Sequence, residues 1–455
     1  MNPSGQDNVL GTANVKILLR QLAIPAITAQ VVNVLYNVVD RMYIGHIPDI
    51  GALALTGVGV CMPIIMLITA FAALVSMGSA PRASVLMGRG DNEEAHYTLG
   101  NSFIMLIIIA LVLMVFFRRF AEPILMAFGA SENTIGYAMD YMRIYTLGTI
   151  FVQFALGLNA FITAQGFAKI SMATVVIGAV INIVLDPIFI FGFHMGVKGA
   201  ALATILSQAV SAIWVLRFLT GKKTILKLQK KYFRLRGSVV GPCLLLGMSP
   251  FIMQATESAI SVCFNSSLYR YGGDIAVGAM SILTSIMQFS MLPLQGFTQG
   301  AQPITGYNFG AGNADRVRQT FRLLLRYCLT YSLILWAICM VVPRLIPSMF
   351  TGDEQLLTYT AWALRHYMAL SGIFGIQIAC QMTFTSLGKA VNSIIVAVVR
   401  KFVLLIPLIY IMPHMISDST TGVYMAEPIA DITAVIFTSV LFTFQFKKAL
   451  AEIQN

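Results

Sequence analysis

Apolar stretches of about 20 residues recur roughly every 35–40 residues along the whole chain, and each can cross ~30 Å of hydrocarbon as a helix. Hydrophobic residues make up 57% of the 455-residue chain and charged residues 11%, which is typical of a membrane protein. We therefore predict an all-α integral membrane fold with twelve transmembrane helices, at residues 17–40, 51–77, 96–117, 137–164, 169–193, 199–219, 239–269, 275–297, 319–343, 355–386, 390–411 and 422–446.

The distribution of positive charge predicts the orientation of these helices. The net charge is +11, but Lys and Arg are scattered through short connections and form no basic, aromatic-interleaved face, so we expect no nucleic-acid partner. Connections on one side carry most of them, including the run at 221–236 and the cluster at 316–322. Because Lys and Arg favour the cytoplasmic side, we expect a multi-pass protein of the inner (plasma) membrane with both termini in the cytoplasm.

The two halves of the chain resemble each other. Gly78, Pro81, Gly88 and Gly90 recur 222 residues later at Gly300, Pro303, Gly310 and Gly312; Pro25 recurs at Pro250, and Gly148 and Gln153 recur at Gly372 and Gln377. Constant offsets indicate duplication, with the substrate site between two copies of equal orientation. We predict two pseudo-symmetric six-helix lobes: an N-lobe at residues 1–220, a basic cytoplasmic linker at 221–236 and a C-lobe at 237–455.

A carboxylate, Asp40, stands at the end of the first apolar segment. Asn33, Tyr36 or Asn37, and Asp40 follow helical spacing and share one polar stripe. A charge at membrane depth costs at least ~2.5–3.5 kcal/mol, so such a residue is by default a functional-site hypothesis. The structural alternative is that Asp40 only ends the helix at the headgroups, where Arg41 follows at once.

The fifth segment contains a second acid. Asn182 and Asp186 stand four residues apart on one helix face, and Pro187 removes a backbone hydrogen bond from the preceding turn. Together with Asp40 these oxygen ligands suit a proton or Na⁺. The alternative is a structural hydrogen-bond network between helices.

These residues resemble motifs of the multidrug and toxic compound extrusion (MATE) transporters, and more closely the branch with the DNA-damage-inducible-protein-F-like members. The matching strings are Leu35-Tyr36-Asn37-x-x-Asp40, Asn182-Ile183-Val184-Leu185-Asp186-Pro187 and Gly196-Val197-x-Gly199-Ala200-Ala201-x-Ala203-Thr204. The resemblance covers nearly the whole chain. It implies a MATE-like fold, a bend in the first helix at Pro25, Tyr36 beside the site, and a cation-coupling site in the N-lobe made of Asp40, Tyr141, Asn159, Asn182, Asp186 and Thr204.

The C-lobe departs from the sodium-linked branch of that family, because its tenth helix carries Gln377 and Gln381 in place of an acid. Glu257 on the seventh helix is a candidate for cationic substrate or a second ion, or equally a structural hydrogen-bonding residue. Arg400 and Lys401 interrupt the eleventh span, and Glu427 and Asp431 interrupt the twelfth. We predict a structural ion pair of Arg400 with Asp431 or Glu427, since unpaired charge in lipid is costly.

The sequence predicts a secondary antiporter that exports amphipathic, often cationic organic compounds by alternating access, in exchange for H⁺ or Na⁺. Its partners are small molecules and the lipid bilayer, it needs no cofactor beyond the coupling ion, and we expect a monomer. One alternative is a lipid-linked saccharide flippase of the same superfamily. Such a flippase would have a strongly basic central cavity for a pyrophosphate head group, which the N-lobe spans here lack. A channel, or a membrane enzyme, is the alternative from another class, but the five scattered histidines suggest no catalytic pair or metal ligands.

Overall fold

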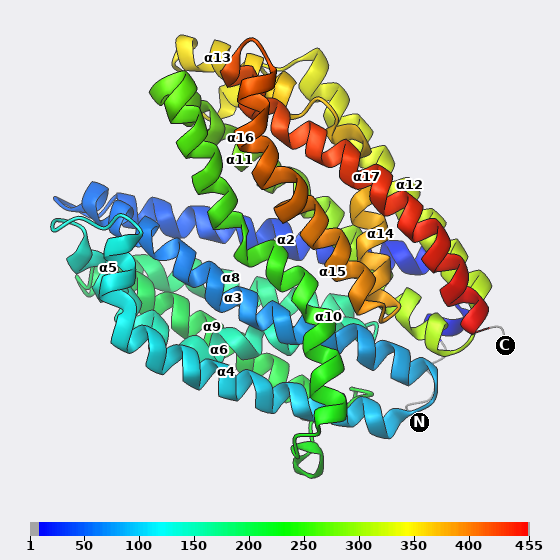
Figure 1. Cartoon of the computed structure of the whole chain (residues 1–455). Helices are drawn as coiled ribbons and strands as arrows, with labels where there is room; N and C mark the ends of the chain where they lie inside the picture. The colour runs from blue at the N-terminus through cyan, green and yellow to red at the C-terminus, as the bar shows by residue number, and fades with distance from the viewer. Residues whose placement is uncertain (1–8, 454–455) are drawn as a thin grey trace.

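The computed structural model describes residues 9–453, and residues 1–8 and 454–455 at the ends of the predicted lobes lie outside the described part. The first half of the chain forms a helical N-lobe (Figure 1). Its helices are α2 (Val15–Gly45), α3 (Gly51–Gly88), α4 (Asn92–Ala127), α5 (Ile135–Leu147), α6 (Thr149–Gly157), α7 (Asn159–Ala164), α8 (Ala168–Pro187), the π-helix η1 (Ile188–Gly192) and α9 (Val197–Thr220).

The second half forms the C-lobe. A 3-10 turn η2 (Lys230–Tyr232) lies in the connection, followed by α10 (Gly237–Ala255), α11 (Glu257–Gly310), α12 (Ala314–Val341), η3 (Pro347–Met349), α13 (Glu354–Tyr367), η4 (Ser371–Ile373), α14 (Phe374–Ser386), α15 (Ala390–Val398), the π-helix η5 (Val399–Leu405), α16 (Ile406–Met415) and α17 (Ser419–Glu452).

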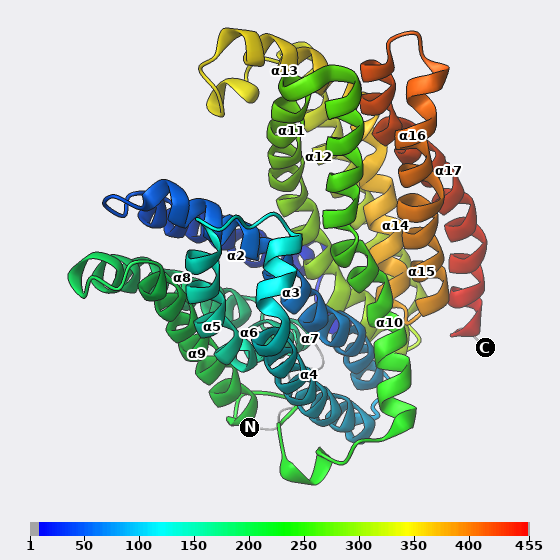
Figure 2. The same ribbon diagram turned by 60° about the vertical axis from the view of Figure 1, so that its left-hand side comes forward.

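The number of spans agrees with the predicted twelve-helix architecture. Among the described residues, nine helical stretches are long and apolar enough to cross a membrane, or eleven when each of two bent pairs is one span. One of them, Gly237–Gly310, contains two predicted spans, because the chain turns back at Gly273, whose φ of 67° and ψ of −162° are not helical (Figure 2). Glycine has no Cβ and adopts this positive φ without strain.

Each of the two bent spans has a repeat-related glycine at its break or just after it. The fourth span bends by 59° between Ile135–Leu147 and Thr149–Ala164, and the tenth by 52° between Glu354–Tyr367 and Ser371–Ser386. Gly148 lies at the first break, and Gly372 lies in η4, just after the second. A Cβ on Gly148 would overlap the Ile205 side chain, so close packing against α9 requires glycine there.

The repeated loop after the second and eighth spans shows why particular residues recur. Gly90 and Gly312 both have positive φ, 79° and 76°, which ends the preceding helix. The next residue, Asp91, accepts a hydrogen bond from the Glu94 backbone N–H at 3.2 Å and caps α4. Asn313 stands at the same position before α12.

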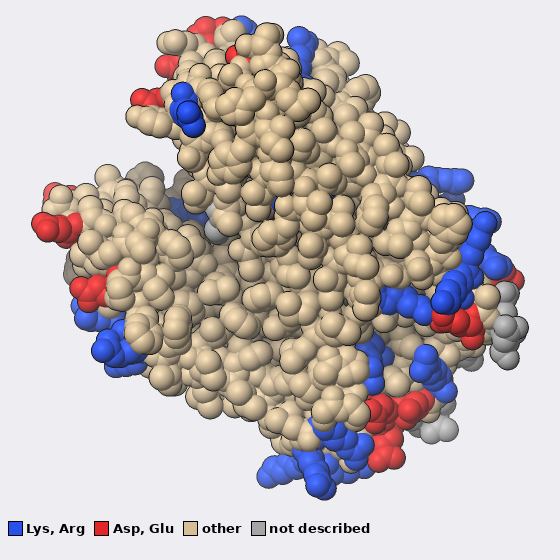
Figure 3. All heavy atoms as spheres, viewed as in Figure 1, with Lys and Arg blue, Asp and Glu red and all other residues tan. Residues whose placement is uncertain are grey.

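The lobes meet at the end of the molecule near both termini and diverge at the other end. Figure 3 shows a hollow between them on the side away from the termini, whereas Lys and Arg gather around the terminal end. A buried cluster from both lobes, including Leu19, Leu22, Leu294 and Ile304, fills the junction. The termini therefore lie at the closed end of the junction and the hollow opens at the other.

The connection between the lobes is anchored on the N-lobe. The Gln165 Oε1 atom accepts hydrogen bonds from Thr224 Oγ1 and from the Ile225 and Leu226 backbone N–H groups, at 2.8–2.9 Å. The Asn101 Oδ1 atom accepts another from the Arg236 N–H at 2.8 Å. The connection is thus held at both ends.

Candidate functional site

The centre of the candidate site is a set of buried oxygen atoms between α8 and α9. Asn182 and Asp186 are fully buried one turn apart on α8. Asn182 Nδ2 donates to Asp186 Oδ1 at 3.3 Å and lies 3.5 Å from Thr204 Oγ1 on α9. The structure therefore brings three of the predicted cation-coupling residues into direct contact.

Asp40 joins this set from α2. It is 7% exposed, and its carboxyl group lies within hydrogen-bonding reach of the Asp186 carboxyl group. Asp40 Oδ1, Asn182 Oδ1 and Asp186 Oδ2 are buried with no hydrogen-bond donor from the described residues. Because a buried acceptor without a donor is costly, this arrangement favours an added proton or cation.

Aromatic hydroxyls surround the carboxylates. Tyr141 on α5 is buried, lies close to the Thr204 side chain, and stacks on Tyr145 with ring centroids 5.9 Å apart. Tyr36 lies close to both Asp40 and Asp186. These rings exclude water from the carboxylates, which strengthens the electrostatic interactions within the site.

The other predicted residues of α2 lie beside this set. The Asn37 side chain donates to the Asn33 carbonyl at 2.6 Å, so part of its hydrogen-bonding capacity is used within its own helix. Both residues are partly exposed. The structure brings two members of the predicted polar stripe, Tyr36 and Asp40, close to Asp186, whereas Asn33 and Asn37 lie beside the site.

Asn159 lies apart from the carboxylates. Its Nδ2 atom donates to the Ser171 carbonyl at 3.2 Å. Ser171 precedes Asn182 on α8 by about 16 Å at 1.5 Å per residue. The structure therefore does not bring Asn159 together with Asp186 in this conformation, and its part in the cation-coupling site stays a prediction.

Helix α8 ends in a π-helix directly after the site. Pro187 cannot donate a backbone hydrogen bond, and η1 follows at Ile188–Gly192. A second π-helix, η5, carries Arg400 and Lys401 in the C-lobe. Such π-segments occur frequently at functional sites, and here each lies beside buried charge.

The predicted charges of the C-lobe form a buried network. Arg400 Nε donates to Asp431 Oδ1 at 2.9 Å, and Arg400 Nη2 donates to Glu427 Oε1 at 2.8 Å. The three side chains are at most 6% exposed. The guanidinium also lies 4.5 Å from the centroid of the Phe374 ring. Arg400 therefore contacts both acids at once instead of one of the two.

Glu257 has a partner that sequence reasoning missed. Its Oε2 atom lies 2.7 Å from Lys401 Nζ; the Lys401 side chain is 7% exposed and the Glu257 side chain 55% exposed. The pair joins α11 to η5 across 144 positions of sequence. The only signal in the sequence for this pair is that Lys401 lies within an apolar span. A lysine at that depth requires an acidic partner.

The two glutamines of α14 differ in their surroundings. Gln381 donates to Ser249 Oγ at 3.1 Å, and Ser249 in turn receives a hydrogen bond from Ser393 at 2.9 Å. Gln377 is 1% exposed, and neither of its amide atoms has a partner among the described residues. Gln381 therefore belongs to a network between helices, whereas Gln377 has free hydrogen-bonding capacity.

Pro25 lies within α2, which continues through it as one helix. Because proline lacks a backbone N–H, the carbonyl of Gln21 loses its usual partner. The structure shows no break at this position, so the bend implied by the family resemblance stays a prediction.

A metal site of the usual type was not found in residues 9–453, where no three His, Cys, Asp or Glu side chains group together. Na⁺ at Asp40, Asn182 and Asp186 would use two carboxylates and one amide oxygen, which are ligands that suit a hard cation.

The helical architecture, the two repeated lobes and the buried charges within both of them define an integral membrane transporter. A model of the MatE family matches residues 25–188 and 250–411, and the chain belongs to that family. The two matched segments fall one in each lobe. The chain is a transporter and not an enzyme.

Known relatives match over nearly their whole length. The chain is 26% identical over 439 residues to the multidrug export protein MepA of Staphylococcus haemolyticus, covering 95% of this chain and 94% of the relative. It is 23% identical over 416 residues to MepA of Staphylococcus aureus (strain NCTC 8325 / PS 47), covering 91% and 90%.

Solved structures share the fold. A crystal structure of MATE in the bent conformation matches with a TM-score of 0.92 at 22% identity, over 99% of both chains. An outward-facing multidrug resistance MATE transporter matches with a TM-score of 0.90 at 23% identity, over 97% and 98%. The family and fold predicted from the sequence are confirmed, while membership of the DNA-damage-inducible-protein-F-like branch stays a prediction.

Proposed function

We propose that the chain is an antiporter that exports amphipathic, cationic organic compounds in exchange for protons bound at Asp40 and Asp186. The observation that carries the proposal is the contact between these two buried carboxyl groups. Two carboxyl groups in such contact cannot both stay charged. They therefore share one proton. Gaining or losing that proton changes the charge of a site between α2 and α8.

The surroundings support export of small molecules. The relatives are named multidrug export proteins, and the hollow between the lobes opens away from the Lys- and Arg-rich end. If that basic end is cytoplasmic, the hollow faces outward and both termini lie inside. The buried N-lobe site is acidic, which favours a cationic substrate over the pyrophosphate of a lipid-linked saccharide.

The coupling follows from linkage. If protonation of Asp40 and Asp186 weakens binding of the cationic substrate, the substrate must weaken proton binding by the same factor. The external proton then promotes substrate release on the side to which the hollow opens. The empty, protonated site then becomes accessible from the cytoplasm. Release of the proton on that side completes the cycle.

The test uses purified protein in proteoliposomes with a pH indicator and a fluorescent cationic dye. The wild type should move dye against its gradient under an imposed pH gradient, with protons moving in the opposite direction. Asp40→Asn and Asp186→Asn should each abolish pH-driven accumulation.

The matched control is Asp140→Asn on α5. This acid lies next to Tyr141 in sequence but pairs with Lys198 at 3.5 Å in a partly exposed position. It should keep wild-type coupling. Dye movement driven by a sodium gradient at constant pH, with no proton flux, would show that Na⁺ is the coupling ion. Dye flux without any counter-ion flux would overturn the antiporter itself.

A further inference from the structure

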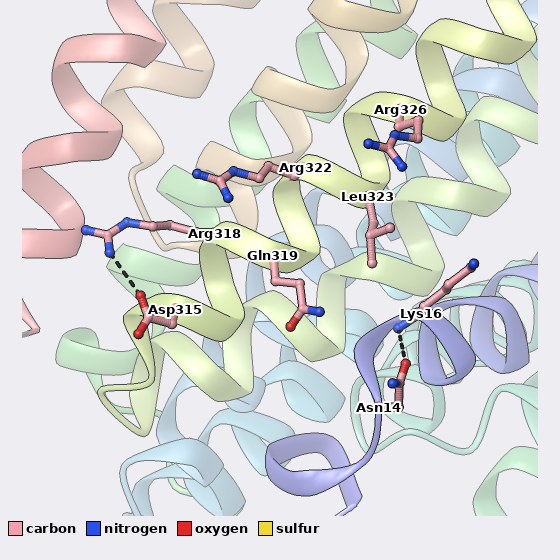
Figure 4. Close-up of a pocket in the computed structure, with 8 residues that line it drawn as sticks. All are labelled: Asn14, Lys16, Asp315, Arg318, Gln319, Arg322, Leu323 and Arg326. Atoms are coloured by element: carbon pink, nitrogen blue, oxygen red, sulfur yellow. Dashed lines mark hydrogen bonds and ion pairs between the residues drawn. The ribbon is translucent and has the colours of Figure 1, made fainter.

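A basic pocket of about 640 Å³ lies at the end of the molecule near the termini, apart from the buried site in the N-lobe. Figure 4 shows its walls, which come from the start of α2 and one face of α12. The lining residues are Asn14, Lys16, Asp315, Arg318, Gln319, Arg322, Leu323 and Arg326.

The charge of this pocket is strongly positive. Four of its side chains are cationic and one is acidic, and that acid, Asp315, pairs with Arg318 at 3.0 Å. Within residues 9–453, no carboxylate pairs with Lys16, Arg322 or Arg326. An anion would therefore meet three cations that carry no partner in the described part of the chain.

The arrangement of the arginines follows the surface of a membrane-spanning helix. Arg318, Arg322 and Arg326 are spaced four residues apart on one face of α12, which gives a ladder of about 12 Å. Arg322 and Arg326 are exposed, and Leu323 lies beside them. Beyond Arg326 the remainder of α12 carries no Lys or Arg. The ladder thus runs from the polar end of the span toward its apolar part, where phospholipid headgroups meet acyl chains.

The start of α2 adds backbone polarity on the opposite wall. Asn14 Oδ1 accepts from the Lys16 N–H at 3.0 Å and caps the helix, which has no acidic residue in its first turn. Unlike many helix starts, this one has no local negative charge to balance its dipole. The dipole therefore adds to the attraction of the three unpaired cations for an anion.

The pocket also joins the two lobes. Close to it, Arg316 Nη2 donates to the carbonyls of Leu10 and Ala13 at 3.1 and 2.8 Å. Arg20 Nε donates to Tyr327 Oη at 3.2 Å. These contacts hold the start of α2 on α12. A ligand that contacts both walls would strengthen the same junction.

We propose that this pocket binds the phosphate of an anionic phospholipid headgroup, and that the bound lipid stabilises the contact between the lobes at this end. A lipid is favoured over free phosphate because the ladder extends along a membrane-spanning helix and includes Leu323. Basic pockets between transmembrane helices bind anionic headgroups in this way.

The test compares the wild type with Arg322→Gln/Arg326→Gln in lipid nanodiscs. Native mass spectrometry would measure retained lipid after incorporation into phosphatidylcholine with a minority of phosphatidylglycerol. The wild type should retain phosphatidylglycerol selectively. In the double variant, the preference for phosphatidylglycerol over phosphatidylcholine should fall roughly ten- to thirtyfold, because two cations near an anionic headgroup are removed. Phosphatidylglycerol should also raise the melting temperature of the wild type but not of the variant.

The matched control is Lys447→Gln/Lys448→Gln, which removes two exposed cations from the end of α17. It should keep the lipid preference. Equal losses in both double variants would show only a general attraction of basic protein for anionic lipid and would overturn the site. Protection by inorganic phosphate in detergent, with no preference for phosphatidylglycerol, would overturn the lipid as ligand. Because nanodiscs present both leaflets, these results do not depend on the orientation or the transported substrate.

Discussion

Gly88 and Gly310, 222 residues apart, lie against each other's helices in reciprocal contacts. A Cβ on Gly88 would overlap the Tyr307 carbonyl, and a Cβ on Gly310 would overlap the Val85 carbonyl, which itself lies 222 residues before Tyr307. The repeat that is visible in sequence is therefore a local two-fold relation in space, between the end of α3 and the end of α11. Both contacts lie at the closed end of the junction.

Substitution at this crossing should destabilise the closed junction. Gly88→Ala or Gly310→Ala forces two backbones apart, and overpacking of this kind costs ~1–3 kcal/mol. Thermal unfolding in detergent should show the loss. Gly59→Ala is the control on the same helix α3, because nothing lies within 4 Å of its added Cβ. Equal stability of Gly59→Ala and Gly88→Ala would show that the crossing is not tight.

Asn182 should matter through the position of Asp186. Asn182→Leu removes the donor to Asp186 Oδ1 and should alter the pH dependence of dye transport, because the Asp186 carboxyl group loses the side chain that holds it in place. Asn182→Asp keeps an oxygen ligand but adds charge, and should impair transport at neutral pH. The measurement is the pH profile of uptake into proteoliposomes. An unchanged profile in Asn182→Leu would remove Asn182 from the site.

The Arg400 network should respond asymmetrically to substitution. Arg400→Met leaves Glu427 and Asp431 buried without their cation, and breaking a buried pair costs ~3–5 kcal/mol. Asp431→Asn leaves Arg400 with Glu427 and should cost less. A double-mutant cycle between Arg400→Met and Asp431→Asn, followed by unfolding, should show coupling of ~0.5–3 kcal/mol. Additive losses would contradict a shared network.

Substitutions at Glu257 and Lys401 can show whether Glu257 only pairs with Lys401 or also binds the substrate. Glu257→Gln leaves the buried Lys401 without its partner, so stability should fall, and Glu257→Gln/Lys401→Met should restore part of it. If Glu257 also binds cationic substrate, the restored double variant should still have a raised Km for the dye. A wild-type Km in the stable double variant would leave Glu257 with a structural role alone.

The span architecture could be predicted because lipid imposes helices of fixed length, but the bends could not. Gly148 and Gly372 are visible as repeated residues, yet their breaks depend on packing against Ile205 and Trp336 from other helices. At the candidate site, Asn182 and Asp186 were predictable as neighbours because helix periodicity fixes them. Their contact with Asp40 was expected from the family resemblance. The partner of Glu257 depended on the tertiary packing of η5, and the contact of Asn159 with Ser171 depended on the packing of α7 against α8.

The anchored connection between the lobes determines where movement can occur. Since Gln165 and Asn101 hold residues 224–236 on the N-lobe, this segment travels with the first six spans as part of one rigid body. A rotation of one lobe against the other must then be absorbed after Arg236, at the start of α10, and not along the polar connection. The length of the connection consequently sets no limit on the amplitude of the movement.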